Sequence, residues 1–321
     1  GEGDEVIVTP LTMSSTTFCV LHANATPIYA DVDKKTFNMD PDSIMKNITS
    51  RTKAIIPVSL FGLSPDMEKI MKIAKDNNLK VLEDNAECFL GKYKNKLVGE
   101  YGDAASYSFQ SSKHLTSGEG GMVITDDEEF ANNLRKVQSL GYSALSNKTA
   151  KISKDEIQDP SYFRHSSLGW NYRMPELCCA VAYAQVERLE ELVNIRKLSG
   201  ELFNQAIKGN EKYLTPQFVP DDYENSYWTW AATIYDESLY HEFRDQFIKA
   251  GGDRFYGAWK LGYQEPFLRD KNLLNREKYL TKEKYDAVMD CITCNYNLLI
   301  KSNGNIFSKI WCFKFCTYIC L

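Results

Sequence analysis

The sequence predicts an α/β protein in which helices flank a mainly parallel sheet. Short apolar runs rich in β-branched residues alternate with segments whose apolar residues recur at helical spacing, as is typical of strand–helix–strand units. Residues 53–60, KAIIPVSL, form a nearly continuous apolar run, which is typical of a strand buried within a parallel sheet. With 321 residues, 43% of them hydrophobic, the chain can bury one large core or two smaller ones.

The first part of the chain supplies four predicted strands, over residues 5–9, 27–33, 53–60 and 79–84. Pro10 ends the first strand, because proline cannot donate a hydrogen bond to a neighbouring strand. Helices are predicted between these strands, over residues 12–21, over 41–48 and from Ser64 onward. The last two begin with a capping residue followed by proline, Asp40-Pro41 and Ser64-Pro65, and Met67, Ile70, Met71 and Ala74 then follow at helical spacing.

Two further strands are predicted over residues 105–109 and 122–125, and we expect both to be buried. A helix that begins at acidic residues runs from 126 to 138, and residues 141–167 carry no regular pattern. A long helix is predicted over residues 175–197, with one face formed by Leu177, Val181, Ala184, Arg188 and Leu192.

The character of the sequence changes after residue 197. An aromatic strand over 227–235 and a helix over 238–250 predict a smaller α/β domain. We therefore divide the chain into a large domain, residues 1–197, and a small C-terminal domain, residues 198–321, whose tail is atypical from about residue 290.

Composition gives no sign of a nucleic-acid or membrane partner. The net charge is −5, the first residues are acidic and polar, and no run of about 18 apolar residues occurs. The nine cysteines are an odd number without the spacing of a disulfide framework. We therefore expect the protein in the reducing cytoplasm.

Lys113 lies on the short loop between the strands predicted at 105–109 and 122–125. A partly desolvated lysine favours its neutral amine, which is the nucleophile needed for covalent chemistry with a carbonyl. Ser108, Ser111 and Ser112 add hydroxyl donors of the kind a phosphate group binds. The alternative is a surface hairpin with a solvated lysine.

Asp84 favours the functional interpretation of Lys113. It ends the strand over residues 79–84, and ligands of open α/β sheets bind beyond the carboxyl ends of the strands. An aspartate and a lysine at that edge suit pyridoxal 5'-phosphate, because the carboxylate can keep the pyridine nitrogen protonated while the amine holds the aldehyde.

Several stretches together resemble one enzyme family. SFQSSKHLTSGEGG around Lys113, EDNAE around Asp84, GDEVIVTPLT near the start and LGWNYRMPEL from Leu168 are similar to motifs of the DegT/DnrJ/StrS-type sugar aminotransferases, which are fold-type-I pyridoxal-phosphate enzymes. The resemblance extends from residue 1 to about 197 and more weakly to about 266. It implies the fold-type-I architecture, with a large cofactor-binding domain and a smaller α/β domain.

The resemblance also implies roles for individual residues. Lys113 corresponds to the lysine that bonds to the cofactor, Asp84 to the partner of the pyridine nitrogen and Ser108 to a phosphate-binding serine. Asn171 corresponds to an asparagine that reaches the phosphate in the neighbouring subunit, which implies a homodimer with shared active sites. Glutamate would be the amino donor and a nucleotide-linked keto-sugar the acceptor, in surface-polysaccharide or deoxyaminosugar biosynthesis.

The sequence departs from the family pattern at its start, in the lining of the expected cofactor pocket and in its tail, which does not resemble the family's C-terminus. The family has a segment before the first strand that supplies part of its phosphate site. Met13 stands where an aromatic residue usually stacks on the cofactor ring, and Glu87 replaces a Gln or His that faces the phenolic oxygen. Two negative groups there would repel each other unless one is protonated. These departures leave open a catalytically silent, truncated relative that acts as a binding protein.

A sugar dehydratase is the other alternative. That branch of the family carries His in place of the lysine, and this chain keeps Lys113, which disfavours it. His114 could assist proton transfer, but adjacent residues commonly point apart and packing is the favoured role. Five cysteines lie in the atypical tail, and we expect no metal site there, because Cys291 and Cys294 supply only two ligands in a C-x-x-C spacing.

Overall fold

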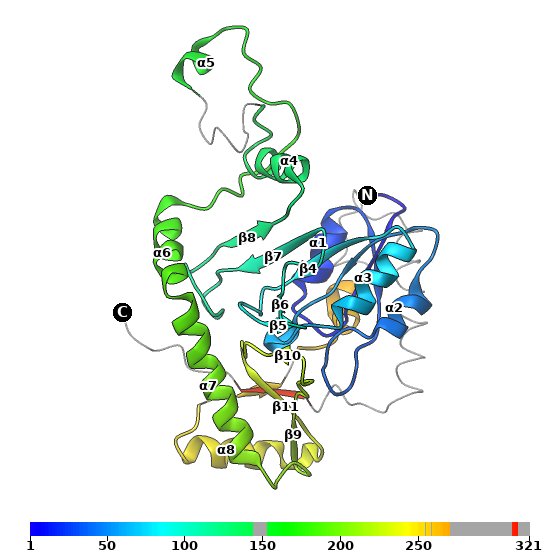
Figure 1. Cartoon of the computed structure of the whole chain (residues 1–321), viewed down its shortest axis with the longest axis vertical. Helices are drawn as coiled ribbons and strands as arrows, with labels where there is room; N and C mark the ends of the chain where they lie inside the picture. Colours follow the sequence, from blue (N-terminus) through cyan, green and yellow to red (C-terminus); the bar gives the residue numbers. More distant parts are fainter. Residues whose placement is uncertain (144–152, 254, 258, 270–309, 314–321) are drawn as a thin grey trace.

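A six-stranded sheet forms the centre of the molecule. The computed structural model describes residues 1–143, 153–253, 255–257, 259–269 and 310–313 (Figure 1). The strands of this sheet are β1 (Glu5–Val8), β2 (Thr26–Tyr29), β3 (Thr52–Ile56), β4 (Lys80–Asp84), β7 (Ala104–Ser108) and β8 (Gly121–Ile124). Their order is β2-β1-β3-β4-β7-β8. All neighbours run parallel except β7 and β8, which are antiparallel. The predicted mainly parallel α/β sheet is therefore confirmed.

The strand register fixes the edge at which the candidate residues meet. Asp84, the last residue of β4, lies opposite Ser106 of the adjacent parallel strand β7. Since parallel neighbours end at the same edge of a sheet, the loops after β4 and β7 emerge side by side. The stretches singled out around residues 84 and 113 thus belong to one edge.

Helices follow the strands in the order that the sequence predicts. They are α1 (Ser15–His22), α2 (Pro41–Asn47), the 3-10 helix η1 (Leu60–Gly62), α3 (Met67–Asp76) and α4 (Glu128–Gln138). Asp40 caps α2 as expected, accepting a hydrogen bond from the Asp42 amide. The cap predicted at Ser64 is wrong: Asp66 caps α3 by accepting from the Lys69 amide, because the chain enters the helix only after Pro65.

Two predictions around residues 120–197 are also wrong. β8 is exposed along its whole length rather than buried. The single helix predicted over 175–197 is divided into α6 (Glu176–Glu187) and α7 (Leu189–Ile207), because Arg188 between them leaves the helical conformation. The predicted apolar face is solvent-exposed at Leu177 and Val181, and the buried positions of α7 are instead Val193, Arg196 and Gly200. The short helix α5 (Lys154–Gln158) lies within the segment predicted to be irregular.

The remaining strands build two small sheets. One is three-stranded, with β5 (Lys92–Tyr93), β6 (Lys96–Leu97) and β10 (Tyr223–Glu224). The other is antiparallel, in the order β12-β13-β11-β9, with β9 (Leu214–Pro216), β11 (Trp230–Ile234), β12 (Tyr256–Gly257) and β13 (Ile310–Phe313). It lies with α8 (Tyr240–Lys249) at the lower end of the molecule in Figure 1. The short helices η2 (Glu237–Leu239), η3 (Gly262–Gln264) and α9 (Pro266–Arg269) complete the described elements.

The second half of the chain shares a core with the first. Trp228, Ala231 and Leu261 pack with residues of the large sheet, such as Val8, and with Phe61 in one buried cluster. The boundary predicted after residue 197 falls inside α7, so this helix continues from one half into the other.

Neither a membrane-crossing helix nor a metal-binding group is found in the part of the chain that the structure describes. No helix there has both the length and the apolar character to cross a membrane. No group of three or more His, Cys, Asp or Glu side chains there could hold a metal ion. The tail cysteines Cys291, Cys294, Cys316 and Cys320 lie outside the described residues.

Candidate active site

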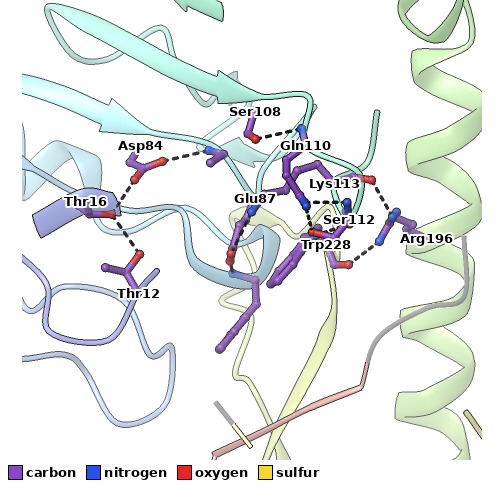
Figure 2. Close-up of polar contacts among 12 residues, drawn as sticks. Thr12, Thr16, Asp84, Glu87, Ser108, Gln110, Ser112, Lys113, Arg196 and Trp228 are labelled. Carbon is purple, nitrogen blue, oxygen red and sulfur yellow. Dashed lines mark hydrogen bonds and ion pairs between the residues drawn. The ribbon is translucent and has the colours of Figure 1, made fainter. Parts of the chain in front are cut away.

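Asp84 is held in a fixed orientation at the end of β4. Its Oδ2 accepts a hydrogen bond of 2.9 Å from the Thr16 hydroxyl of α1, and its Oδ1 accepts one of 3.2 Å from the Ala86 amide (Figure 2). The Thr16 hydroxyl also lies 3.3 Å from that of Thr12. Each carboxylate oxygen therefore has a donor while the carboxylate remains half-buried, so it is positioned to meet a cationic group.

Glu87 lies between Asp84 and Lys113. It is buried, its Oε2 accepts a hydrogen bond of 3.1 Å from the Phe61 amide, and its Oε1 lies 3.3 Å from Lys113 Nζ (Figure 2). Burial raises the pKa of Glu87, and the charge of Asp84 acts in the same direction, whereas Lys113 and the Phe61 amide oppose it. A raised pKa favours the protonated carboxyl, which could donate a hydrogen bond to an anionic oxygen without charge repulsion.

Lys113 projects from the loop after β7 towards Glu87. Its side chain is only 12% exposed, so the solvated-hairpin interpretation is wrong. Nζ also lies 4.5 Å from the centre of the Trp228 ring. The amine thus sits between the Glu87 carboxyl group and an aromatic face.

The serines of the loop are ordered by Gln110. Ser108 Oγ accepts a hydrogen bond of 3.2 Å from the Gln110 amide. This bond uses the oxygen of Ser108 and not its hydroxyl proton. The Gln110 side chain accepts from both the amide and the hydroxyl of Ser112, and it donates to Ser111. The loop therefore gathers hydroxyl groups next to Lys113, as an anion site requires.

Two of the predicted site residues lie apart from these contacts. Met13 is 51% exposed on the loop before α1, where its carbonyl accepts from the Thr16 amide. Asn171 is exposed, and its backbone forms a bridge with Ser139. No hydrogen bond within the described chain links Asn171 to Asp84 or Lys113, and its role across a subunit interface stays a prediction.

His114 is buried beside the Ser226 backbone. It is 3% exposed, and its Nε2 lies 3.0 Å from the Ser226 carbonyl oxygen. Burial, followed by the positive charge of Arg196, lowers the pKa of His114 to about 3. The imidazole is thus neutral at physiological pH, in agreement with the packing role favoured from sequence.

Sequence reasoning missed three residues that organise the site: Thr16, Arg196 and Trp228. Arg196 is buried and donates hydrogen bonds to the carbonyl oxygens of Trp228 and Lys113. The Trp228 indole donates to the Ser112 carbonyl. The sequence offers one signal for Arg196. It shares a helical face with Val193 and Gly200, and an arginine is unusual on a buried face.

The arrangement fits pyridoxal phosphate. A carboxylate, a nearly buried amine and a hydroxyl-rich loop occur at one edge of a parallel sheet, and these groups complement a pyridine nitrogen, an aldehyde and a phosphate. The charge conflict expected at Glu87 is eased by the burial that favours its protonated form. Lys113, Asp84, Ser108 and Glu87 are therefore the residues that could hold the cofactor.

Comparison with known proteins identifies relatives. The model of the DegT/DnrJ/EryC1/StrS aminotransferase family matches residues 1–292. The spore coat polysaccharide biosynthesis protein SpsC of Bacillus subtilis is 35% identical over 255 residues, 79% of this chain and 64% of the relative. GDP-perosamine synthase of Escherichia coli O157:H7 is 36% identical over 206 residues, 64% of this chain and 52% of the relative. The chain thus spans about half to two thirds of the length of these relatives.

The fold also matches solved structures. The X-ray structure of an aminotransferase from Psychrobacter cryohalolentis superposes with a TM-score of 0.75 at 28% sequence identity, covering 93% of this chain and 82% of that one. This similarity confirms the predicted fold-type-I architecture.

Proposed function

Because the chain belongs to the DegT/DnrJ/EryC1/StrS aminotransferase family, we propose that it is a pyridoxal-phosphate-dependent sugar aminotransferase. Its amino donor would be glutamate and its acceptor a nucleotide-linked keto-sugar. Two relatives are named GDP-perosamine synthase and spore coat polysaccharide biosynthesis protein, which supports a role in surface-polysaccharide or deoxyaminosugar biosynthesis.

The observation that carries the proposal is the meeting of Asp84 and Lys113 at one sheet edge. Asp84 is the last residue of β4, Lys113 lies in the loop after the adjacent parallel strand β7, and Glu87 lies 3.3 Å from the Lys113 amine. Bound pyridoxal phosphate supplies an electron sink for labile bonds at the carbon that carries the amino group. The residues that would hold it are Lys113 at the aldehyde, Asp84 at the ring nitrogen and Ser108 at the phosphate.

The remaining site residues have supporting roles in this proposal. Glu87 would donate from its protonated carboxyl to the phenolic oxygen, and Met13 would pack on the ring. The Lys113 amine, when free, would take up and return the proton at the substrate carbon as general base and acid. Trp228 and the buried Glu87 limit the access of water to this amine.

A homodimer is supported by an exposed apolar surface. We call it the β8–α6 surface; it comprises Met122, Val123, Ile124, Leu177, Val181 and Val186, which are 37% to 83% exposed. The loop that leads into β8 contacts α6, because the Thr116 amide donates to the Gln185 side chain. Apolar side chains gathered in this way mark protein–protein interfaces. A second copy covering this surface could bring its own Asn171 to the phosphate.

A cytoplasmic location is part of the proposal. The four cysteines whose side chains the structure describes, Cys19, Cys88, Cys178 and Cys179, are all free thiols. Free thiols are typical of proteins in a reducing compartment.

The proposal is tested by reconstitution. Purified protein mixed with pyridoxal phosphate should become yellow and, with glutamate and a nucleotide-linked keto-sugar, should release 2-oxoglutarate. The Lys113→Ala variant should lose both properties, whereas Lys72→Ala, which removes an exposed lysine paired with Asp76, should keep them.

Other outcomes would favour the alternatives. Cofactor binding without turnover would support a catalytically silent relative. A keto-deoxy product that gains no amino group would support a dehydratase. An absence of any spectral difference between the wild type and Lys113→Ala would contradict the pyridoxal-phosphate proposal.

A further inference from the structure

The backbone around Lys113 is held by side chains from distant parts of the chain. Arg196 of α7 donates from Nη2 to the Lys113 carbonyl oxygen at 2.9 Å and from Nη1 to the Trp228 carbonyl oxygen at 2.6 Å (Figure 2). The Trp228 indole donates to the Ser112 carbonyl oxygen at 2.8 Å. Two consecutive carbonyl groups of the loop are therefore bound from outside it, which fixes the peptide plane from which the Lys113 side chain starts.

The far end of the Lys113 side chain is held by the same tryptophan. Nζ lies 4.5 Å from the centre of the Trp228 ring and 3.3 Å from Glu87 Oε1. An amine that is protonated is attracted electrostatically to the face of an aromatic ring at this distance. Trp228 thus contacts the backbone next to Lys113, at Ser112, and the far end of the Lys113 side chain.

Trp228 is itself fixed by a column of aromatic rings. It stacks on Trp259 with ring centres 6.0 Å apart, and Trp259 stacks on Phe61 at 5.8 Å. The Phe61 amide donates to Glu87. The two groups that flank the Lys113 amine, the Trp228 ring and the Glu87 carboxylate, are therefore parts of one packed unit.

Stability alone does not account for a buried arginine at this position. Arg196 is 3% exposed, and burial lowers its pKa to about 10, so it remains a cation at neutral pH. Within the described chain its hydrogen bonds go to two neutral carbonyl oxygens and no carboxylate pairs with it. Burying a cation in this way costs free energy that an apolar side chain would avoid.

We propose that Arg196 and Trp228 are positioning residues that hold the Lys113 amine where it meets the aldehyde of the cofactor. The inference rests on the proposed function, and it gives Arg196 and Trp228 a positioning role that the proposed function does not include. Reactive groups lose about 100-fold in rate when they are misplaced by about 1 Å. A lysine that has several rotatable bonds and must repeatedly bond to and leave a cofactor depends on such restraint.

The test separates attachment of the cofactor from binding of the cofactor. Attachment is the rate at which pyridoxal phosphate becomes fixed to Lys113 by borohydride reduction, measured by mass spectrometry. Binding is the dissociation constant of pyridoxamine phosphate, which has no aldehyde and cannot bond to lysine. Arg196→Gln should slow attachment about tenfold or more and change the dissociation constant of pyridoxamine phosphate by less than about twofold.

Matched variants guard against a purely structural effect. Arg196→Lys should recover part of the rate, and Trp228→Phe, which keeps an aromatic face, should attach cofactor faster than Trp228→Leu. Arg188→Gln, at an exposed arginine between α6 and α7 that pairs with Glu191, should behave as wild type. If Arg196→Gln does not fold, the two Trp228 variants carry the test.

The inference would be overturned if the Arg196 and Trp228 variants attached cofactor as fast as wild type. It would also be overturned if attachment and pyridoxamine phosphate binding weakened in equal proportion, since that is the result of general damage. If wild-type protein itself attached no pyridoxal phosphate, the proposed function would fall and this inference with it.

Discussion

Two regions of the molecule differ in the surroundings of their side chains. One is the edge of the sheet at Asp84 and Lys113, and the other is the β8–α6 surface. At the edge, Asp84, Glu87 and Lys113 each have a partner within the chain, and Glu87 and Lys113 are nearly solvent-free. On the β8–α6 surface, apolar side chains such as Val123 and Leu177 face solvent. The polar groups of the first region are paired within a single chain, whereas the other region has the character of a surface that a further molecule covers.

The difference indicates which part of the proposed chemistry one chain can perform. In the proposal, Lys113 and Asp84 would hold and orient the cofactor with supports from their own chain, because these supports come from α1, from α7 and from Trp228, two residues before β11. Asn171 is exposed and precedes α6, so its predicted contribution depends on a second copy. Mutations at the edge should therefore affect chemistry, and mutations on the β8–α6 surface should affect assembly first.

The largest effect is expected from Lys113→Ala. Loss of the amine removes both the covalent anchor and the general base, so glutamate-dependent transamination should fall by about 1,000-fold or more. Steady-state release of 2-oxoglutarate measures this, with Lys72→Ala as the control. A Lys113→Ala variant that kept a substantial part of the wild-type rate would place the chemistry elsewhere.

Asp84→Asn should have the next largest effect. Removing the carboxylate charge leaves the ring nitrogen without its anionic partner, and kcat should fall by about 100-fold. Thr16→Val deletes only one hydrogen bond to the same carboxylate, so it should cost about threefold to tenfold. Equal losses in the two variants, measured by the same assay, would show that the charge is not the important property of Asp84.

On the β8–α6 surface, Val123→Asp and Val181→Asp should convert a dimer into monomers. A carboxylate buried in an apolar interface costs several kcal/mol unless it is paired. Light scattering coupled to size-exclusion chromatography measures the mass. Met45→Asp, at a methionine of α2 that is 51% exposed, is the matched control. Monomeric variants that kept full transaminase activity would argue against a shared site at Asn171.

The smallest effect is expected from His114, and it appears only at acidic pH. The pKa of this buried imidazole is lowered to about 3, below the value of about 6.5 in an unfolded chain. Its contribution to stability is therefore complete above about pH 6.5 and is lost as the pH falls towards about 3. When the pH is lowered from about 7 to about 4.5, the melting temperature of His114→Asn should fall less than that of the wild type. Parallel melting curves would contradict the assignment of a neutral, buried His114.

Much of the fold could be predicted because the signals are local. Apolar runs of strand length, the proline at the start of α2 and the alternation with helices determine the parallel sheet. The exposure of β8 could not be predicted, since Met122, Val123 and Ile124 have the composition of a buried strand. The break between α6 and α7 at Arg188 could not be predicted either, because the helical pattern of the sequence continues across it.

The site was predictable only where its residues end strands. Asp84 ends β4, Glu87 follows it and Lys113 follows β7, so adjacent strands bring them together. Arg196 and Trp228 join the site through contacts that span 83 and 116 residues of sequence. Such contacts depend on how α7 and the start of β11 pack against the loop, and no local pattern specifies that packing.

The most direct test of the account is to locate the lysine that holds pyridoxal phosphate. The protein is loaded with cofactor, reduced with borohydride and digested, and the labelled peptide is sequenced by mass spectrometry. We predict one label per chain, on Lys113. Labels scattered over surface lysines such as Lys72, or no label at all, would contradict the claim that the edge of the sheet at Asp84 and Lys113 is a cofactor site.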